Sequence, residues 1–128
     1  MNKNVLVIAI CFIVVAIILG AFGAHGLKEH VTSEKLASFE TGVKYQMYHG
    51  LALLVIGLNA DKLAFSLTSV TGFIILGTLL FSVSIYFLAI QEMLGMSLKF
   101  LGPITPIGGG LLIIGWVIFL VKIIRLRV

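Results

Sequence analysis

Four long apolar runs, separated by short polar segments, organise this sequence. They cover residues 5–24, 42–58, 68–90 and 106–124, and the second run is the shortest. About 20 consecutive apolar residues are enough for a helix to cross the hydrocarbon core of a bilayer. The pattern therefore predicts an all-α, integral membrane four-helix bundle, in which residues 1–128 form a single domain of four transmembrane helices.

Helix-start signals refine two of these runs. Thr32 is placed to cap the second helix, with Glu34 in the first turn, where an acidic side chain is favoured. The early turns of that helix carry several charged residues, so we expect them to lie at or above the membrane interface. In the last run, Thr105 is expected as the N-cap and Pro106 as the first helical residue, where the missing proline N–H costs nothing.

Composition favours lipid as the solvent for most of the chain. Hydrophobic residues make up 60% of the sequence and charged residues only 11%, whereas soluble domains carry about 25% charged residues. Anionic lipid headgroups account for the formal net charge of +4 better than nucleic acid does, because the sequence has no basic face with interleaved aromatic residues. The expected partners are membrane lipids, with a homo-oligomer or a membrane-protein partner as further options, and no nucleic acid.

The charges also bear on orientation. An even number of crossings places both termini on one side of the membrane, and positive charge favours the cytoplasm. The side of the termini carries Lys3, Lys62, Lys122, Arg125 and Arg127. The opposite side carries Lys28, Lys35, Lys44 and Lys99. This small excess predicts a multi-pass protein of the cell membrane with both termini in the cytoplasm.

The first run contains the only cysteine, Cys11, so no internal disulfide is expected. A small buried thiol is the expected state of this residue. The run is long enough to cross a bilayer, which favours a transmembrane helix over the shorter core of a cleaved secretory signal.

A polar stripe runs along the second helix. At 100° per residue, Thr41, Tyr45, Tyr48 and His49 fall on one face. Polar groups in hydrocarbon need partners, so we expect this stripe to turn inward. The third helix offers such partners on a single broad face: Thr71, Thr78, Ser82 and Tyr86. Trp116, in the middle of the last run, is likewise expected to find an internal acceptor for its indole N–H.

The histidines His25 and His49 are the strongest candidates for chemistry. They are expected at similar depth, which suits a structural hydrogen-bonded pair, a proton relay or bis-histidine ligation of haem. The structural pair is favoured, because intramembrane polar residues generally pair with other helices first. Neither a metal-ligand spacing nor a nucleophile with a neighbouring base is present, so we predict no metal, no cofactor and no enzyme activity. Gly108 and Gly109, with Thr105, are a candidate anion site at a helix start, but close helix packing is the favoured use of these glycines.

Several segments together resemble a known family. They are Gly20-Ala21-Phe22-Gly23-Ala24-His25-Gly26-Leu27, Thr41-Gly42-Val43-Lys44-Tyr45-Gln46-Met47-Tyr48-His49, Phe81-Ser82-Val83-Ser84-Ile85-Tyr86 and Thr105-Pro106-Ile107-Gly108-Gly109, with Gly115-Trp116. The chain resembles the small four-span membrane family catalogued as domain of unknown function number 423, which has no established reaction. The resemblance implies that His25, Tyr45, Gln46, Tyr48 and His49 belong to the family signature. With Ser82 and Tyr86 they form the candidate intramembrane polar cluster.

These observations leave three hypotheses for function. The leading one is a non-catalytic protein that stabilises the membrane or assists a partner. The alternatives are a binder or carrier of a lipid-like small molecule and a minimal channel. The resemblance to a largely bacterial family makes the bacterial plasma membrane the expected location.

Overall fold

The structure, a computed structural model, describes residues 1–127. Val128, the last residue of the predicted domain, lies outside the described residues. The long helices are α1 (Lys3–His25), α2 (Ser33–Leu58), α3 (Thr68–Thr78), α4 (Ser84–Ile90) and α5 (Ile104–Ile124). A π-helical turn, η3 (Leu79–Val83), joins α3 to α4 without a break, and the short 3-10 turns are η1 (Leu27–Glu29), η2 (Ala60–Lys62) and η4 (Lys99–Leu101). Residues 1–127 contain no strand, and the all-α fold class is confirmed.

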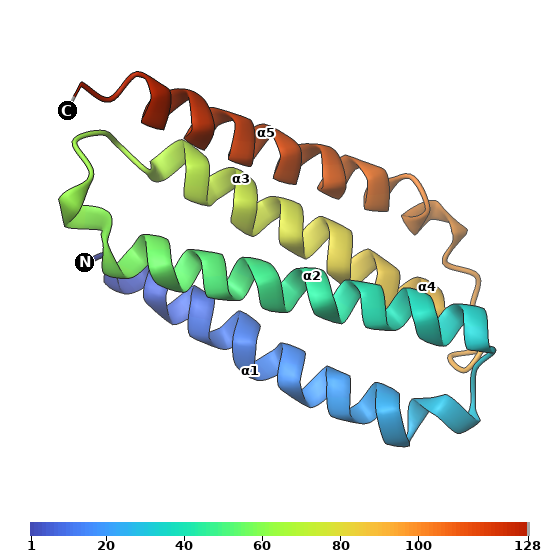
Figure 1. The fold of residues 1–128 in the computed structure, drawn as a ribbon. Coiled ribbons are helices and arrows are strands. Elements are labelled where there is room, and N and C mark those ends of the chain that lie inside the picture. The colour runs from blue at the N-terminus through green and yellow to red at the C-terminus, as the bar shows by residue number, and fades with distance from the viewer. Residues whose placement is uncertain (128) are drawn as a thin grey trace.

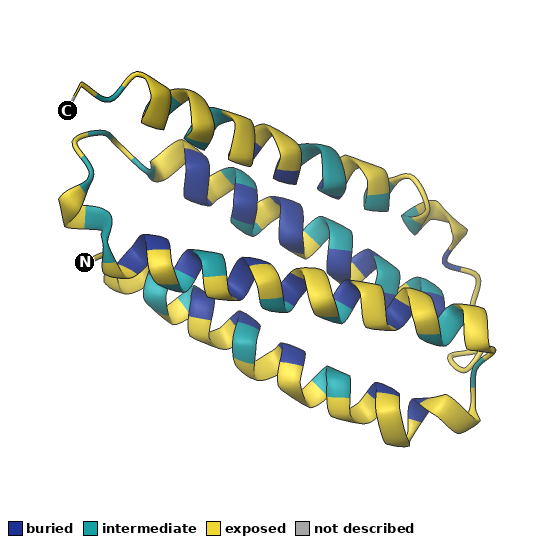
Figure 2. Ribbon diagram, viewed as in Figure 1, coloured by how far each residue is buried: buried dark blue, intermediate teal, exposed yellow. Residues whose placement is uncertain are grey.

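The helices lie side by side in the order α1, α2, α3 with α4, and α5, and both termini lie at the same end of the bundle (Figure 1). The extensive contacts are α1 with α2, α2 with η3 and α4, and α3 and η3 with α5. The buried residues follow the facing sides of α2 and α3, while α1 and α5 present most of their surface outward (Figure 2). The two central helices therefore form the core, and the two outer helices cover it from opposite sides.

Three helical segments are long and apolar enough to cross a membrane by length and composition: Lys3–Glu29, Thr68–Ile90 and Lys99–Ile124. All four predicted ranges are helical, because 42–58 lies within α2. The first turns of α2 are charged, and α2 is not among the three segments. Its crossing, and with it the count of four crossings, stays a prediction.

Glycines let the helix backbones approach closely. A Cβ added at Gly57 would lie 2.9 Å from Leu6 of α1, and one at Gly77 would lie 2.8 Å from the Leu112 nitrogen of α5. At Gly108 the corresponding distance to the Phe81 nitrogen of η3 is 2.3 Å, which no real side chain tolerates. Small residues at such contacts supply the dispersion contact that holds helices together in lipid.

The two predicted helix starts have different outcomes. Thr32 caps α2 as expected, because its hydroxyl accepts a hydrogen bond from the Lys35 N–H at 3.3 Å. The prediction for α5 is wrong: the helix begins at Ile104 with Pro103 at the cap position. The Thr105 hydroxyl contacts Ser84 instead of capping the helix, and the fixed φ of Pro103 already suits a helix start.

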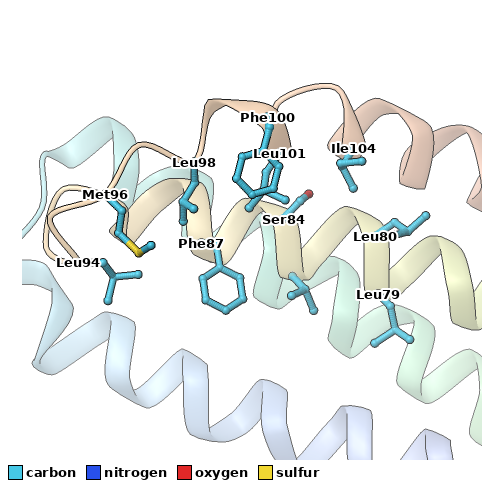
Figure 3. Close-up of a pocket in the computed structure, with 11 residues that line it drawn as sticks. Leu79, Leu80, Ser84, Phe87, Leu94, Met96, Leu98, Phe100, Leu101 and Ile104 are labelled. Carbon is cyan, nitrogen blue, oxygen red and sulfur yellow. The ribbon is translucent and has the colours of Figure 1, made fainter.

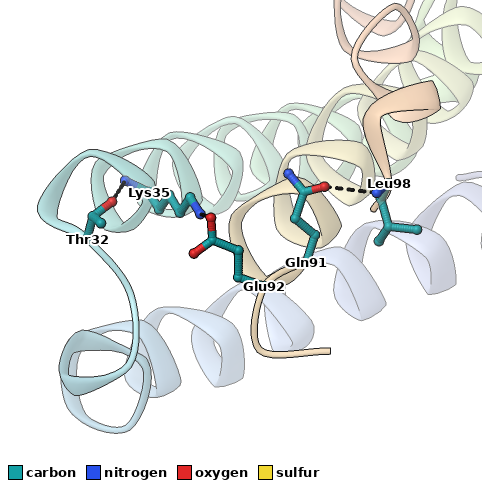
Figure 4. A network of polar contacts seen from close by, with 5 residues as sticks. All are labelled: Thr32, Lys35, Gln91, Glu92 and Leu98. Carbon is teal, nitrogen blue, oxygen red and sulfur yellow. Dashed lines mark hydrogen bonds and ion pairs between the residues drawn. The ribbon is translucent and has the colours of Figure 1, made fainter. Parts of the chain in front are cut away.

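Polar contacts tie the connections at each end of the bundle. The Lys35 ammonium pairs with Glu92 at 2.6 Å, and the Gln91 side chain accepts a hydrogen bond from the Leu98 N–H at 2.8 Å (Figure 4). At the opposite end, the amino group of Met1 pairs with Asp61. The connection between α4 and α5 is thus held against the first turns of α2.

Candidate functional site

Gln46 joins three helices in the buried centre of the molecule. Its side-chain amide donates to the Phe12 carbonyl of α1 at 3.0 Å, and its carbonyl accepts from the Tyr86 hydroxyl of α4 at 2.8 Å. Gln46 and Tyr86 are both buried. Both the N–H and the carbonyl side of this amide are therefore hydrogen-bonded. The bond to Tyr86 is a polar contact between the second and third apolar segments, as the sequence predicted.

Ser82 makes a second bond between the same segments. Its hydroxyl donates to the Gly42 carbonyl at 2.8 Å, and the side chain is fully buried. Gly42 is required at this point, because a Cβ there would lie 2.8 Å from the Tyr86 ring. Thr71 and Thr78 are buried on the same side of α3, as the sequence pattern predicts, and donate to carbonyls four residues back in their own helix.

His49 connects α2 to α5. The Trp116 indole N–H donates to Nε2 of His49 at 3.0 Å, and Nδ1 of His49 lies 2.7 Å from the Tyr45 carbonyl. Indole is only a donor and a carbonyl only an acceptor. The imidazole is therefore neutral, with its proton on Nδ1, and both ring nitrogens are occupied. Trp116 has the internal partner that its midspan position predicts.

The expectation that the whole tyrosine–histidine stripe turns inward is wrong for Thr41, Tyr45 and Tyr48. Thr41 is exposed, and the side chains of Tyr45 and Tyr48 are 42% and 58% exposed, whereas Gln46 and His49 are buried. The buried face of α2 is centred about one residue further round the helix than the stripe. Three glycines on that face set the rotation, because they lie where the neighbouring helices come closest: Gly42, Gly50 and Gly57.

The prediction that His25 and His49 lie at similar depth is also wrong. On α1, the residues that pack against Gly50 are Phe12 and Ile13. His25 lies about three turns further along α1, roughly 18 Å at 1.5 Å per residue. It is exposed at the last turn of its helix. A shared hydrogen bond or a shared haem between these two histidines is therefore excluded within one chain.

The residues of the candidate anion site have partners within the chain. The Ser84 hydroxyl donates to the Phe81 carbonyl at 2.9 Å, so the 2.6 Å contact with Thr105 uses the Thr105 hydrogen. Gly108 is covered by η3, and a Cβ at Gly109 would lie 3.6 Å from the Phe81 ring. The packing alternative thus accounts for both glycines, and anion binding at this helix start stays a prediction.

A hollow lies beside His49, on the side of Tyr45. This midspan hollow, of about 520 Å³, lies between α2 and α5. In residues 1–127 these two helices make no extensive direct contact, so the hollow opens sideways. Its lining consists of Tyr45, His49, Phe81, Gly109, Leu112, Ile113, Trp116 and Val117. The Tyr45 ring packs on Phe81 with centroids 5.0 Å apart, and its hydroxyl makes no hydrogen bond within the described part of the chain.

Another hollow, apolar and of about 430 Å³, lies under the connection between α4 and α5 (Figure 3). Side chains of η3 and α4 form its floor, and the connection contributes Leu94, Met96 and Phe100. Ser84 is its only polar side chain, and the Ser84 hydroxyl is already bonded. Leu94, Met96 and Phe100 are all exposed, the last by 70%, and such a group of exposed apolar side chains is unusual for a connection that faces water. This connection therefore presents an apolar surface where the helices end.

No group of three or more metal-ligating side chains occurs among residues 1–127. Cys11 is exposed, so the prediction of a buried thiol is wrong. Cys11 lies on the rim of a hollow between α1 and η3, which Leu79 and Val83 also line, so its side of α1 is left uncovered. In this part of the chain, the buried side-chain polar atoms all have hydrogen-bond partners.

These features define a small, multi-helix integral membrane protein whose polar core is hydrogen-bonded between helices. The chain matches a family described as protein of unknown function (DUF423) over residues 19–109, more than half of its length. The UPF0382 membrane protein of Staphylococcus epidermidis is 41% identical over 106 residues, which are 83% of each chain. UPF0382 membrane protein YwdK of Bacillus subtilis is 40% identical over 112 residues, which are 86% of this chain and 87% of the relative. The chain belongs to the DUF423 family, as its motifs indicate. No solved structure matches it.

Proposed function

We propose that the chain is a non-catalytic accessory protein of the bacterial plasma membrane, with both termini in the cytoplasm. The observation that supports a non-catalytic role is the full pairing of the polar core. Gln46 uses both ends of its amide, His49 both ring nitrogens, and Ser82 its hydroxyl proton. A general base or nucleophile needs a free lone pair within reach of a substrate, and a general acid needs a free proton. In these side chains the named atoms are already engaged in hydrogen bonds that hold the helices together.

The test separates a structural role of the polar core from a chemical one. Cells that lack the protein are challenged with detergent or osmotic downshift, and rescue by His49→Gln and Tyr86→Phe is compared with the melting temperature of each purified variant. For a non-catalytic protein, rescue follows the amount of folded protein. A variant that folds with an unchanged melting temperature and gives no rescue would show chemistry at that side chain. Normal growth of the deletion strain under every challenge would remove the accessory role.

A second candidate function, binding of a lipid-like molecule, is favoured by the midspan hollow. It is of ligand size, since pockets for small molecules are about 300–1,000 Å³. It opens sideways towards the bilayer and is lined by Tyr45, whose hydroxyl has no partner among residues 1–127. Mass spectrometry of gently extracted protein tests this candidate. Protein that carries no reproducible bound molecule would count against it.

A further inference from the structure

A second hollow lies next to the midspan hollow, at the end of the bundle where α2 begins. This loop-end hollow, of about 480 Å³, is lined by Lys35, Ser38, Thr41, Ile85, Leu88, Ala89, Gly102, Thr105 and Pro106. On α2, Thr41 of the loop-end hollow lies one turn from Tyr45 of the midspan hollow. On α5, Thr105 lies one turn from Gly109. The two hollows therefore follow one another along α2 and α5, and together they are called the α2–α5 groove below.

Polar groups collect at one end of this groove. Lys35 and Ser38 lie in the first turns of α2, while Phe81, Ile113 and Val117 line the midspan end. From Ser38 to His49 the groove follows α2 for roughly 16 Å at 1.5 Å per residue. A cationic and hydroxyl-bearing end at the start of the helix and an apolar end at midspan match the layering of one bilayer leaflet, in which phosphates lie above acyl chains.

Apart from the Tyr45 hydroxyl, the free donors in the groove lie at its polar end. The Lys35 ammonium has three N–H groups and pairs with one Glu92 oxygen at 2.6 Å (Figure 4), so donors remain for another acceptor. The Ser38 hydroxyl makes no hydrogen bond within residues 1–127. Thr41 and Thr105 can only accept further bonds there, because Thr41 donates to the Ala37 carbonyl and Thr105 to Ser84.

We infer that the α2–α5 groove binds a diacyl phospholipid from the surrounding leaflet. Lys35 and Ser38 donate to its phosphate, and one acyl chain lies along Phe81, Ile113 and Trp116. A neutral amphiphile would bring no negative charge to the Lys35 ammonium, and free phosphate would leave the apolar half of the groove empty. The inference rests on the second candidate function and adds to it the class of lipid and the place of its headgroup.

Trp116 provides the measurement, because it is the only tryptophan and lines the midspan end of the groove. The full-length protein in detergent micelles is titrated with phosphatidylglycerol whose acyl chains carry bromine, which quenches indole fluorescence on contact. Diacylglycerol with the same brominated chains is the matched control without phosphate. We expect saturable quenching by the phospholipid, with a midpoint about tenfold lower than for diacylglycerol, and no displacement by inorganic phosphate.

Variants locate the headgroup. Lys35→Gln and Ser38→Ala should each raise the phospholipid midpoint, by about tenfold for the lysine, and Lys35→Arg should keep it near that of the parent protein. Lys44→Gln is the matched control, because Lys44 is exposed on the same helix and lies outside the groove lining. Circular dichroism shows that each variant is folded.

The outcomes separate the two proposals. Equal quenching by phospholipid and diacylglycerol, or an unchanged midpoint in folded Lys35→Gln and Ser38→Ala, overturns the headgroup inference and leaves lipid binding in place. Displacement by inorganic phosphate also overturns it, because the site would then take phosphate without the lipid. If neither brominated lipid quenches saturably, the lipid-binding candidate fails as well.

Discussion

The indole N–H of Trp116 donates to Nε2 of His49 at 3.0 Å and thereby joins α5 to α2 across a groove. Since these two helices make no other extensive contact in residues 1–127, this bond is a main direct link between them. It also sets the imidazole tautomer, because the other nitrogen must then donate to the Tyr45 carbonyl.

The first prediction is that His49 and Trp116 are energetically coupled. His49→Leu and Trp116→Phe should each lower the free energy of unfolding, and the double variant should lose less than the sum of the two. The coupling energy should be about 0.6–1.7 kcal/mol, the range measured for hydrogen bonds between membrane helices. A double-mutant cycle of unfolding in detergent checks this, with Trp116 emission as an additional probe of His49→Leu. Strict additivity of the two losses would contradict the bond.

The second prediction concerns Gly108. Its Cβ position lies 2.3 Å from the Phe81 nitrogen and 2.8 Å from the Leu80 carbonyl carbon, and backbone atoms cannot move aside cheaply. Gly108→Ala should therefore destabilise the protein by at least the upper part of the overpacking range of about 1–3 kcal/mol. Gly110→Ala is the matched control, because nothing lies within 4 Å of that Cβ position. Thermal unfolding of the two variants gives the comparison, and equal melting temperatures would rule out the close contact.

The third prediction ranks two changes in the Gln46 network. Gln46→Leu removes the bonds to Phe12 and Tyr86 and leaves the buried Tyr86 hydroxyl without a partner. Tyr86→Phe removes one bond and leaves one lone pair of the Gln46 carbonyl unused. An unsatisfied buried polar group costs about 1–3 kcal/mol, so Gln46→Leu should be the more destabilising change in unfolding measurements. The reverse order would show that the amide is not held as described.

The fourth prediction places the connection between α4 and α5 in the membrane interface. Phe100 is 70% exposed and Leu94 is 47% exposed, beside the apolar hollow that they help to line. In a Cys11→Ser background, a spin label at Phe100→Cys should collide with lipid-soluble oxygen more than with a water-soluble nickel reagent. Glu92→Cys, whose side chain is 80% exposed in the same connection, should show the opposite preference. Higher nickel contact at position 100 would place the connection in water.

The fifth prediction tests whether α2 crosses the membrane. If it does, His30 and Asp61, at its two ends, lie on opposite sides, with Asp61 on the side of the termini. Single cysteines at these positions in a Cys11→Ser background should react differently with an impermeant maleimide added to intact cells. Labelling of His30→Cys alone supports cytoplasmic termini. Equal labelling of both positions would mean that α2 does not cross.

The sequence predicted the helices and one of the two buried polar faces. Thr71, Thr78, Ser82 and Tyr86 recur with helical spacing in an otherwise apolar segment, and all four are buried. The midspan position of Trp116 likewise indicated an internal partner. In both cases the residue type and its depth decide the outcome, since a polar group in hydrocarbon must be paired.

The rotation of α2 was not predicted, because it depends on neighbours that periodicity does not identify. The polar stripe through Tyr45 and Tyr48 predicted one inward face, whereas the structure buries the face that carries Gly42, Gly50 and Gly57. The glycine face is the buried one, since close backbone approach to α1 and α4 is possible only there. His49 lies between the two faces and was predicted correctly to be buried. Its hydrogen-bond partner on α5 and the π-helical turn η3 could not be predicted from the sequence pattern, because both depend on tertiary packing.

The positions of the close glycine contacts and of the side-chain hydrogen bonds between helices have a consequence for assembly. Glycine contacts close each half of the chain on itself, α1 on α2 through Gly57 and α3 on α5 through Gly77. Hydrogen bonds of Gln46 and His49, together with the close contact of Gly42 with Tyr86, connect one half to the other. The fold can therefore be regarded as two helical hairpins whose shared face carries the Gln46 and His49 hydrogen bonds. Loss of these bonds would weaken the contact between the hairpins and leave the close packing at Gly57 and Gly77 inside each hairpin in place.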